Sequence, residues 1–215
     1  MTDPIDLANL RRDYGTRPLE RSALAADPIL QFEQWFAEAL GAGTLDPNAM
    51  SVATVGADGQ PSLRIVLLKH FDARGFIFYT NLDSRKAGEI GGNPRVALLL
   101  YWAEISRQVR ITGTASRVST AETLRYFLTR PRDSQIGAWV SQQSRALEGR
   151  QLLERKFAEL KSRFASGEIP LPAFWGGFRV EPHTIEFWQA RENRLHDRFL
   201  YSRAGAVWTI ERLAP

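Results

Sequence analysis

Short segments with apolar residues at alternate positions, separated by tight turns, constrain the fold of this chain most strongly. The segments 50–55 and 62–71 flank Asp58-Gly59, a dipeptide typical of two-residue hairpin turns. Strands joined by such a turn pair in the antiparallel sense, so the pattern favours an antiparallel sheet. Further strands are predicted over 76–80, 95–102, 107–118, 177–180, 184–189, 194–202 and 207–212.

Helices are predicted at the edges of these strands and in one later block. Asp27-Pro28 is typical of a helix start, with Asp27 as the N-cap and Pro28 at the first helical position, and Gly41 ends that helix. Other helices are predicted over 85–91 after a possible cap at Ser84, from the capping box Ser119–Glu122 to Pro131, over 133–140 and over 148–164.

The order of these elements predicts a mainly β fold with peripheral helices, of the α+β class, in which an antiparallel barrel carries helices inserted over about 119–165. One domain over 27–215 is the simplest organisation. The polar, irregular segment 1–26 precedes it and is expected to form a mobile arm or lid.

Composition excludes several classes of function. The 215 residues include no Cys and three His, so disulfides, thiolate catalysis and zinc–thiolate sites are excluded and no metal site is predicted. Neither an apolar run of membrane-spanning length nor a signal sequence is visible, and a cytoplasmic protein is expected. The net charge of +4 comes from scattered basic residues, which favours local sites for small phosphorylated ligands over a nucleic-acid surface.

Two groups of residues are suited to binding phosphate. Arg64 interrupts an apolar strand, and Tyr79-Thr80 and Ser84-Arg85-Lys86 place hydroxyls and cations around a helix start. Tyr126 and Arg130 lie four residues apart on one helix face, and Ser134 follows the break at Pro131. Each group alone also has a purely structural interpretation. The first fits an ordinary capped helix, and the second fits a surface Tyr–Arg pair. Together they indicate two phosphorylated ligands held side by side.

A third group lies near the C-terminus. In an extended strand, Arg194, His196 and Arg198 would project from one face, which indicates an anionic or electron-rich ligand or, alternatively, a solvated sheet face. Trp188 suits either a flat aromatic ligand or the core. Gln108 and Gln143-Ser144 could hydrogen-bond the amide-like edge of a ring.

With these residues in view, the chain resembles the pyridoxine/pyridoxamine 5′-phosphate oxidase family over nearly its whole length. The stretch Ile-Glu-Phe-Trp-Gln at 185–189, followed by Arg-Leu-His-Asp-Arg at 194–198, is similar to the signature of that family. The similarity extends through 64–69, 79–81, 84–86, 130–139, 170–179 and 212–215.

The resemblance implies an FMN-binding split-barrel flavoprotein, homodimeric, with FMN in clefts at the subunit interface. It implies oxidation of pyridoxine or pyridoxamine 5′-phosphate to pyridoxal 5′-phosphate, with O₂ reoxidising the flavin. By the same resemblance, the FMN contacts fall on Arg64, Ile65, Val66, Leu67, Leu68, Lys69, Tyr79, Thr80, Arg85, Lys86, Gln108, Gln143, Ser144, Trp188 and Arg198. The substrate contacts fall on Arg11, Tyr14, Lys69, Tyr126, Arg130, Ser134, Arg194 and His196.

Arg194 and His196 are the expected catalytic residues, in orienting and electrostatic roles, because loss of a hydride is the central step. A divergent split-barrel flavin reductase is the alternative within the same fold. That protein has no need of a second phosphate site, so the group around Arg130 argues against it. A basic nucleic-acid-binding barrel is the alternative from another class, and it predicts no bound flavin.

Overall fold

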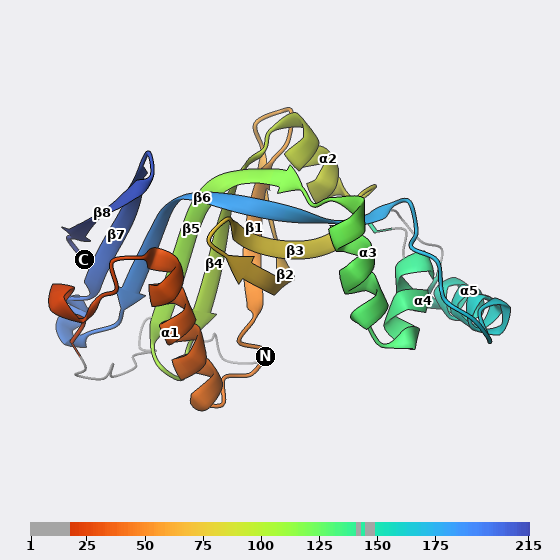
Figure 1. Cartoon of the computed structure of the whole chain (residues 1–215), viewed down its shortest axis with the longest axis horizontal. Helices are drawn as coiled ribbons and strands as arrows, with labels where there is room; N and C mark the ends of the chain where they lie inside the picture. Colours follow the sequence, from red (N-terminus) through yellow and green to blue (C-terminus); the bar gives the residue numbers. More distant parts are fainter. Residues whose placement is uncertain (1–17, 141–142, 145–148) are drawn as a thin grey trace, which may run out of the picture. The chain divides into compact units, whose positions relative to one another are not determined.

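The structure is a computed structural model that describes residues 18–140, 143–144 and 149–215 (Figure 1). Its residues group into two compact units. Unit 1 takes the described residues of Met1–Pro47, together with Tyr101–Val109 and Ile185–Pro215, and unit 2 takes those of Asn48–Leu100 and Arg110–Thr184. Each unit is described by itself.

Eight strands form one sheet in the order β3-β2-β1-β4-β5-β6-β7-β8, and a further pairing of β3 with β6 closes its first six strands into a barrel. Antiparallel pairing joins β1 to β2 and to β4, β3 to β2 and to β6, and β7 to β8, as the hairpin pattern predicts. The strands are β1 (Ala49–Val55), β2 (Pro61–Asp72), β3 (Gly75–Asn81), β4 (Arg95–Trp102), β5 (Arg107–Arg117), β6 (Trp175–Gln189), β7 (Asp197–Ala204) and β8 (Val207–Leu213).

The predicted helices are all present, with ends shifted by one or two residues. In α1, the Asp27 carboxylate accepts a hydrogen bond from the Ile29 N–H at 2.8 Å, and Pro28 begins the helix. Ser119 caps α3 by accepting from the Glu122 N–H at 3.2 Å. The helices are α1 (Pro28–Gly41), α2 (Arg85–Gly92), α3 (Thr120–Thr129), α4 (Arg132–Val140) and α5 (Arg150–Arg163), with short 3₁₀ turns at Arg21–Ala23 and Glu192–Arg194.

The prediction of two short strands between residues 177 and 189 is wrong. The separate strands predicted over 177–180 and 184–189 are parts of a single strand, β6, which runs through Pro182. Glycines on the neighbouring strands accommodate this passage: a Cβ on Gly75 of β3 would lie 2.0 Å from the Val180 carbonyl oxygen, and one on Gly113 of β5 would lie 2.2 Å from the Glu181 carbonyl oxygen. The backbones of β3 and β5 can therefore both approach β6 closely near Pro182.

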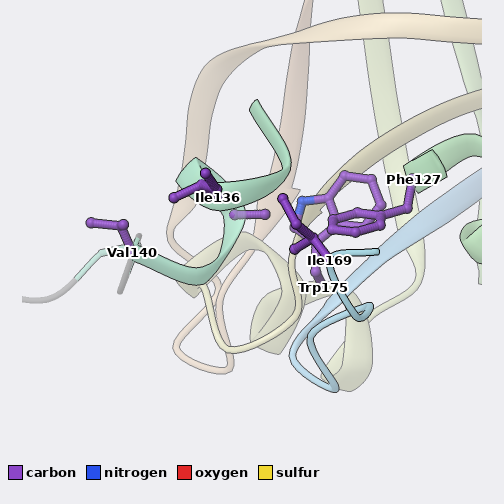
Figure 2. Packing of buried hydrophobic residues seen from close by; sticks show 6 residues of the cluster. Phe127, Ile136, Val140, Ile169 and Trp175 are labelled. Carbon is purple, nitrogen blue, oxygen red and sulfur yellow. The ribbon is translucent and has the colours of Figure 1, made fainter. Parts of the chain in front are cut away.

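Buried aromatic and aliphatic side chains connect the helices of unit 2 to its sheet. Figure 2 shows Phe127 of α3 beside Trp175 of β6, and their ring centroids lie 5.3 Å apart in an edge arrangement. Ile136 and Val140 of α4 and Ile169 extend the same cluster. Figure 1 shows α4 and α5 side by side, and α5 contributes partly buried apolar side chains to this cluster. The cluster fixes α3 and α4, whose neighbouring residues line the site below.

Two expectations about the whole chain stay predictions. The arm predicted over 1–26 lies largely outside the described residues. The single domain over 27–215 is the other. Within the described ranges, no helix has both the length and the apolar character needed to cross a membrane.

The close approach at β6 gives a test of the fold. Gly113→Ala should lower the free energy of unfolding by about 1–3 kcal/mol, because its methyl group overlaps the backbone of β6 rather than a movable side chain. Gly88→Ala, in α2 with open space around its Cβ, is the matched control and should be neutral or stabilise by roughly 0.5–1 kcal/mol. Urea unfolding of both variants measures the difference, and equal stability of the two would contradict the packing described here.

Candidate active site

A cavity of about 660 Å³ lies in unit 2 between β2, β3, α2 and the segment that joins α3 to α4. Among the described residues, four cationic side chains and no carboxylate line it, which is the arrangement expected of a site for an anionic ligand. All but three of its residues were predicted as site residues. The lining consists of Arg64, Ile65, Val66, Leu67, Lys69, Tyr79, Thr80, Lys86, Tyr126, Thr129, Arg130, Pro131, Ser134, Gln143 and Trp175.

Strand β2 supplies the longest run of lining residues. Its side chains alternate in exposure from Pro61 to Leu67, as the period-two pattern predicts. The pairing with β3 shifts between Leu68 and His70, so Lys69 lies at a bulge, a feature that redirects a side chain. Leu68 differs from the other predicted residues of this run because its side chain is buried and does not line the cavity. Contact of Leu68 with a cofactor stays a prediction.

The start of α2 forms the first cationic group. Lys86 donates hydrogen bonds from Nζ to Thr80 Oγ1 at 2.8 Å, Ser84 Oγ at 3.2 Å and Gln143 Oε1 at 3.0 Å. All three acceptors are neutral, so these contacts leave the ammonium charge uncompensated. Burial, together with the charge of Arg64, lowers the pKa of Lys86 from 10.5 to about 8. An anion bound beside Lys86 would stabilise the charged ammonium and so offset the free-energy cost of its burial.

Two further predicted residues lie beside this group. The Arg85 backbone N–H donates to Ser144 Oγ at 3.2 Å, which joins the helix start to the segment after α4. Ser84 occupies the N-cap position, but its side chain does not cap the helix; its hydroxyl donates to the Asn81 carbonyl oxygen at 2.6 Å instead. The expectation that Ser84 caps α2 with its side chain is therefore wrong, because its hydroxyl bonds back to its own turn.

Arg130 and three stacked aromatic rings form the second group. The Tyr79 and Tyr126 centroids lie 4.1 Å apart, and Tyr79 lies parallel to Trp175 at 5.2 Å with an interplanar angle of 6°. The guanidinium carbon of Arg130 lies 4.7 Å from the Trp175 ring centroid. Its Nη1 is buried and has no hydrogen-bond partner among the described residues. A buried donor of this kind is costly unless a ligand accepts from it.

Both tyrosines of this wall keep their protons at neutral pH. Burial raises the pKa of Tyr79 to about 12, and burial raises the pKa of Tyr126 above its ordinary value. Each phenol is thus a hydrogen-bond donor in a cavity whose described lining residues include no acid to accept from it. Ser134, in the first part of α4, adds a hydroxyl to the same lining.

A second set of predicted residues lies in unit 1. The His196 ring stacks at a tilt on Trp188, with centroids 4.6 Å apart, and its Nδ1 accepts a hydrogen bond from the Arg191 N–H at 3.1 Å. Burial, with a smaller contribution from Arg194, lowers the pKa of His196. The imidazole is therefore neutral at neutral pH, and because Nδ1 is an acceptor its proton resides on Nε2.

Arg198 is held by a buried acid. Its Nε donates to Glu186 Oε1 at 2.8 Å, and its Nη1 donates to the Ala214 carbonyl oxygen at 2.8 Å. The hydrogen bond from Arg198 to Glu186 raises the pKa of Arg198, so this side chain stays cationic. Gln108, also in unit 1, is half-buried on β5.

The prediction that 194–202 is one strand is wrong at its start. Asn193 and Arg194 adopt left-handed backbone conformations, with φ of 55° and 61°, inside a 3₁₀ turn, and β7 begins only at Asp197. Arg194, His196 and Arg198 therefore do not alternate along one strand, and the argument from a shared sheet face fails. Arg194 is exposed in this turn. Arg11 and Tyr14 lie outside the described residues.

Among the residues that the sequence did not predict, two hold the cations of the cavity in place. Trp175 supports Arg130, although its motif had been noted only as part of the family resemblance. Glu89 accepts hydrogen bonds from the side chains of Arg64 and Arg85 without lining the cavity itself. The spacing of Arg85 and Glu89, four residues apart on a helix, was a visible signal for that pair.

The desolvated ammonium of Lys86 can be tested directly. In protein free of bound anions, the Lys86 side chain should titrate with a pKa of about 8, and Arg64→Gln should raise that pKa. The value should stay below 10.5, because burial, the larger cause, remains. Side-chain ¹³C NMR measures this titration. Arg117→Gln, which removes an exposed charge away from the cavity lining, is the control and should leave it unchanged. An ordinary lysine titration in the unmodified chain would contradict the burial of Lys86.

Comparisons with known proteins place the chain in one family. Residues 36–164 match the family model described as pyridoxamine 5′-phosphate oxidase, and residues 175–215 match the one described as the pyridoxine 5′-phosphate oxidase C-terminal dimerisation region. The chain is 57% identical over 211 residues to the pyridoxine/pyridoxamine 5′-phosphate oxidase of Aeromonas hydrophila subsp. hydrophila, covering 98% of this chain and 100% of that protein. It is 58% identical over 210 residues to the enzyme of the same name from Rubrobacter xylanophilus, covering 98% and 97% of the two chains.

Solved structures show the same fold. The crystal structure of PhzG from Burkholderia lata 383, in complex with tetrahydrophenazine-1-carboxylic acid, matches with a TM-score of 0.87 and 33% identity, over 93% of this chain and 99% of that one. A pyridoxamine 5′-phosphate oxidase-related, FMN-binding protein from Nostoc punctiforme PCC 73102 matches in fold alone, with a TM-score of 0.70 and 17% identity over 90% and 99% of the chains. The chain is an oxidoreductase that belongs to the pyridoxine/pyridoxamine 5′-phosphate oxidase family.

Proposed function

We propose that the chain is an FMN-dependent oxidase that converts pyridoxine or pyridoxamine 5′-phosphate to pyridoxal 5′-phosphate. The observation that carries this proposal is that one cavity holds two cationic groups, one around Arg64 and Lys86 and one around Arg130, with no acid among its described lining residues. A reaction between a phosphorylated cofactor and a phosphorylated substrate requires two phosphate anchors in one site. The names of the relatives at 57% and 58% identity support the choice of substrate.

The residues present fit a phosphorylated flavin. Lys86 is a desolvated cation whose protein partners are neutral, and the hydroxyls of Thr80 and Ser144 lie at the same helix start. Phosphate oxygens at the start of a helix receive both backbone N–H groups and the favourable end of the helix dipole. In this proposal the 5′-phosphate of FMN is held by Arg64, Arg85, Lys86 and Ser144. Gln143, whose side-chain oxygen accepts from Lys86, completes that group.

The second cationic group fits the phosphate of the substrate. Arg130 has a buried Nη1 without a partner among the described residues, and Tyr126 remains a protonated donor beside it. Lys69 and Ser134 add a cation and a hydroxyl to the same lining. Charge-assisted hydrogen bonds from these groups would fix the phosphate far from the reacting carbon, so that binding energy orients the ring without entering the chemistry.

When bound, FMN would supply the redox chemistry, which is removal of a hydride equivalent from C4′ of the substrate and passage of the electrons to O₂, giving H₂O₂. The chain contributes charge and orientation. Arg198, kept cationic by Glu186, would stabilise the negative charge that develops on a reduced ring. His196 holds its proton at Nε2 and can donate a hydrogen bond to the oxygen or nitrogen at C4′, while Arg194 would cover the substrate ring. Arg11 and Tyr14 would close over the substrate as a lid.

We also propose that the active form is a homodimer with FMN at the subunit interface. Leu63, Ile65 and Leu67 form an apolar stripe on β2, and their side chains are 67%, 64% and 42% exposed. Ile65 and Leu67 also line the cavity, so a partner that covers this stripe would also reach the cofactor site. The match of residues 175–215 to a dimerisation region supports the same assembly.

Anaerobic reduction tests the reaction. FMN-loaded protein mixed with pyridoxine 5′-phosphate in the absence of O₂ should lose the visible absorbance of oxidised flavin, and air should restore it. Unphosphorylated pyridoxine at the same concentration is the matched control and should bleach the flavin far more slowly, because it lacks the anchor for the second site. Persistent absorbance with pyridoxine 5′-phosphate, together with rapid bleaching by a reduced nicotinamide, would favour the flavin reductase.

Arg130→Ala tests whether the two phosphate groups are distinct. Loss of a charge-assisted hydrogen bond should raise the KM for pyridoxine 5′-phosphate by roughly 10- to 100-fold and leave the dissociation constant of FMN unchanged. Arg125→Ala removes an exposed arginine from α3, outside the cavity lining, and should change neither value; α3 ends at Thr129, so Arg130 follows this helix and does not lie on it as the sequence predicted. Steady-state kinetics give the KM for pyridoxine 5′-phosphate, and flavin fluorescence gives the dissociation constant of FMN. Equal weakening of substrate and FMN would contradict separate sites.

A further inference from the structure

Glu89 is a carboxylate that the reaction proposed above does not use. It lies on α2, its side chain is 7% exposed, and it does not line the cavity. Four side chains donate to it. Its Oε1 accepts from Arg85 Nε at 2.7 Å, and its Oε2 accepts from Thr54 Oγ1 at 2.5 Å, Ser62 Oγ at 2.6 Å and Arg64 Nη2 at 3.3 Å.

The two hydroxyls also connect Glu89 to Arg64 indirectly. Thr54 Oγ1 and Ser62 Oγ each accept a hydrogen bond from the Arg64 guanidinium and donate to Glu89 Oε2. The direction of every bond in this network is therefore fixed by the carboxylate at one end and the guanidinium at the other. Arg64 is held both by its direct ion pair with Glu89 and through these two bridges.

Glu89 is ionised despite its burial. Desolvation alone would raise its pKa, but the hydrogen bonds from Ser62, Thr54 and Arg85, with the charge of Arg85, lower the pKa to about 2. A full negative charge thus lies directly behind the cations expected to bind a phosphate. By charge alone Glu89 would weaken phosphate binding, so a favourable role must come from the geometry that it imposes on the arginines.

We propose that Glu89 is a positioning residue that orients Arg64 and Arg85 toward the 5′-phosphate of FMN, an inference that rests on the proposed function. Arg64 and Arg85 come from different elements, β2 and α2, and Glu89 is the one carboxylate that contacts both among the described residues. It also offsets the mutual repulsion of Arg64, Arg85 and Lys86 before the phosphate binds.

The way Arg85 is held leaves both of its Nη groups for a ligand. Glu89 engages Arg85 only through Nε, and the Nη groups of Arg85 have no protein partner among the described residues. Arg64 lines the cavity, but both of its Nη atoms donate to protein acceptors, so the Nε is the donor that remains for a ligand among the described residues. A flexible arginine that is ordered only on binding loses conformational entropy at that step, and an arginine already held in place does not.

Binding of FMN and riboflavin to the apoprotein distinguishes positioning from a general structural role, because riboflavin has the same ring without the phosphate. Glu89→Gln should weaken FMN binding by roughly tenfold or more and leave riboflavin binding unchanged. Flavin fluorescence quenching gives both dissociation constants, and thermal unfolding gives the stability of each variant. The expected result is a fall in the preference for FMN over riboflavin.

Glu122→Gln is the matched control. Glu122 is also a partly buried carboxylate paired with an arginine, Arg179, at 2.9 Å, and it does not line the cavity. Its loss should leave the preference for FMN unchanged even where stability falls. Ser62→Ala provides a second test variant that alters no charge, and it should lower the preference for FMN in the same direction as Glu89→Gln by removing one bridge to Arg64.

The remaining outcomes each overturn the inference. Tighter FMN binding by Glu89→Gln would mean that the repulsion between Glu89 and the phosphate outweighs any positioning. If Glu89→Gln weakened the binding of FMN and riboflavin equally, or weakened neither, the role of Glu89 would be limited to connecting α2 to the sheet. If the unmodified chain bound riboflavin as tightly as FMN, the proposed phosphate site and the proposed cofactor would both be wrong. That result is distinct from one in which only the proposed role of Glu89 fails.

Discussion

The pairing of β3 with β6 is the interaction on which the rest of unit 2 depends. It closes the strand order into a barrel, and its register sets Tyr79 opposite Gly177. A Cβ on Gly177 would lie 2.8 Å from Tyr79 Cε1, so the absence of a side chain there lets the tyrosine ring lie against the neighbouring strand. Trp175, two residues earlier on β6, then stacks on the same ring. The β3–β6 pairing thus both closes the barrel and positions the stacked rings of Tyr79 and Trp175 that line the cavity.

Charge is distributed around this wall in a consistent way. The cations Arg64, Lys69, Lys86 and Arg130 line the cavity, whereas the acid that contacts Arg64 lies behind the lining. An acid within the lining would satisfy the cations and compete with an anionic ligand. An acid behind it can orient the cations while their remaining donors reach the cavity. Burial lowers the pKa of Lys86, whereas burial alone would raise the pKa of Glu89, which is low because Ser62, Thr54 and Arg85 donate hydrogen bonds to its carboxylate.

The sequence predicted local features well because local residues determine them. The cap at Asp27, the capping contact at Ser119 and the alternation along β2 all appear where the pattern placed them. Two failures share a different origin. The continuity of β6 through Pro182 depends on glycines of other strands, and the break before β7 depends on left-handed backbone at Asn193 and Arg194, which no periodicity signals. The partners of Glu89 escaped notice likewise, because Thr54 and Ser62 lie 35 and 27 residues away in the chain.

The cavity in unit 2 is built for binding rather than for proton transfer. Among the described residues, no His, Asp or Glu lines it, and Tyr79, with a pKa of about 12, cannot serve as a base at neutral pH. Under the proposed function, its cations and hydroxyls would anchor two phosphates while a hydride passes between the two anchored rings. The neutral His196 of unit 1, which accepts from the Arg191 N–H at Nδ1, would then be the proposed residue best suited to manage a proton. On that proposal, anchoring and proton handling fall to different residues, so that each can be altered without the other.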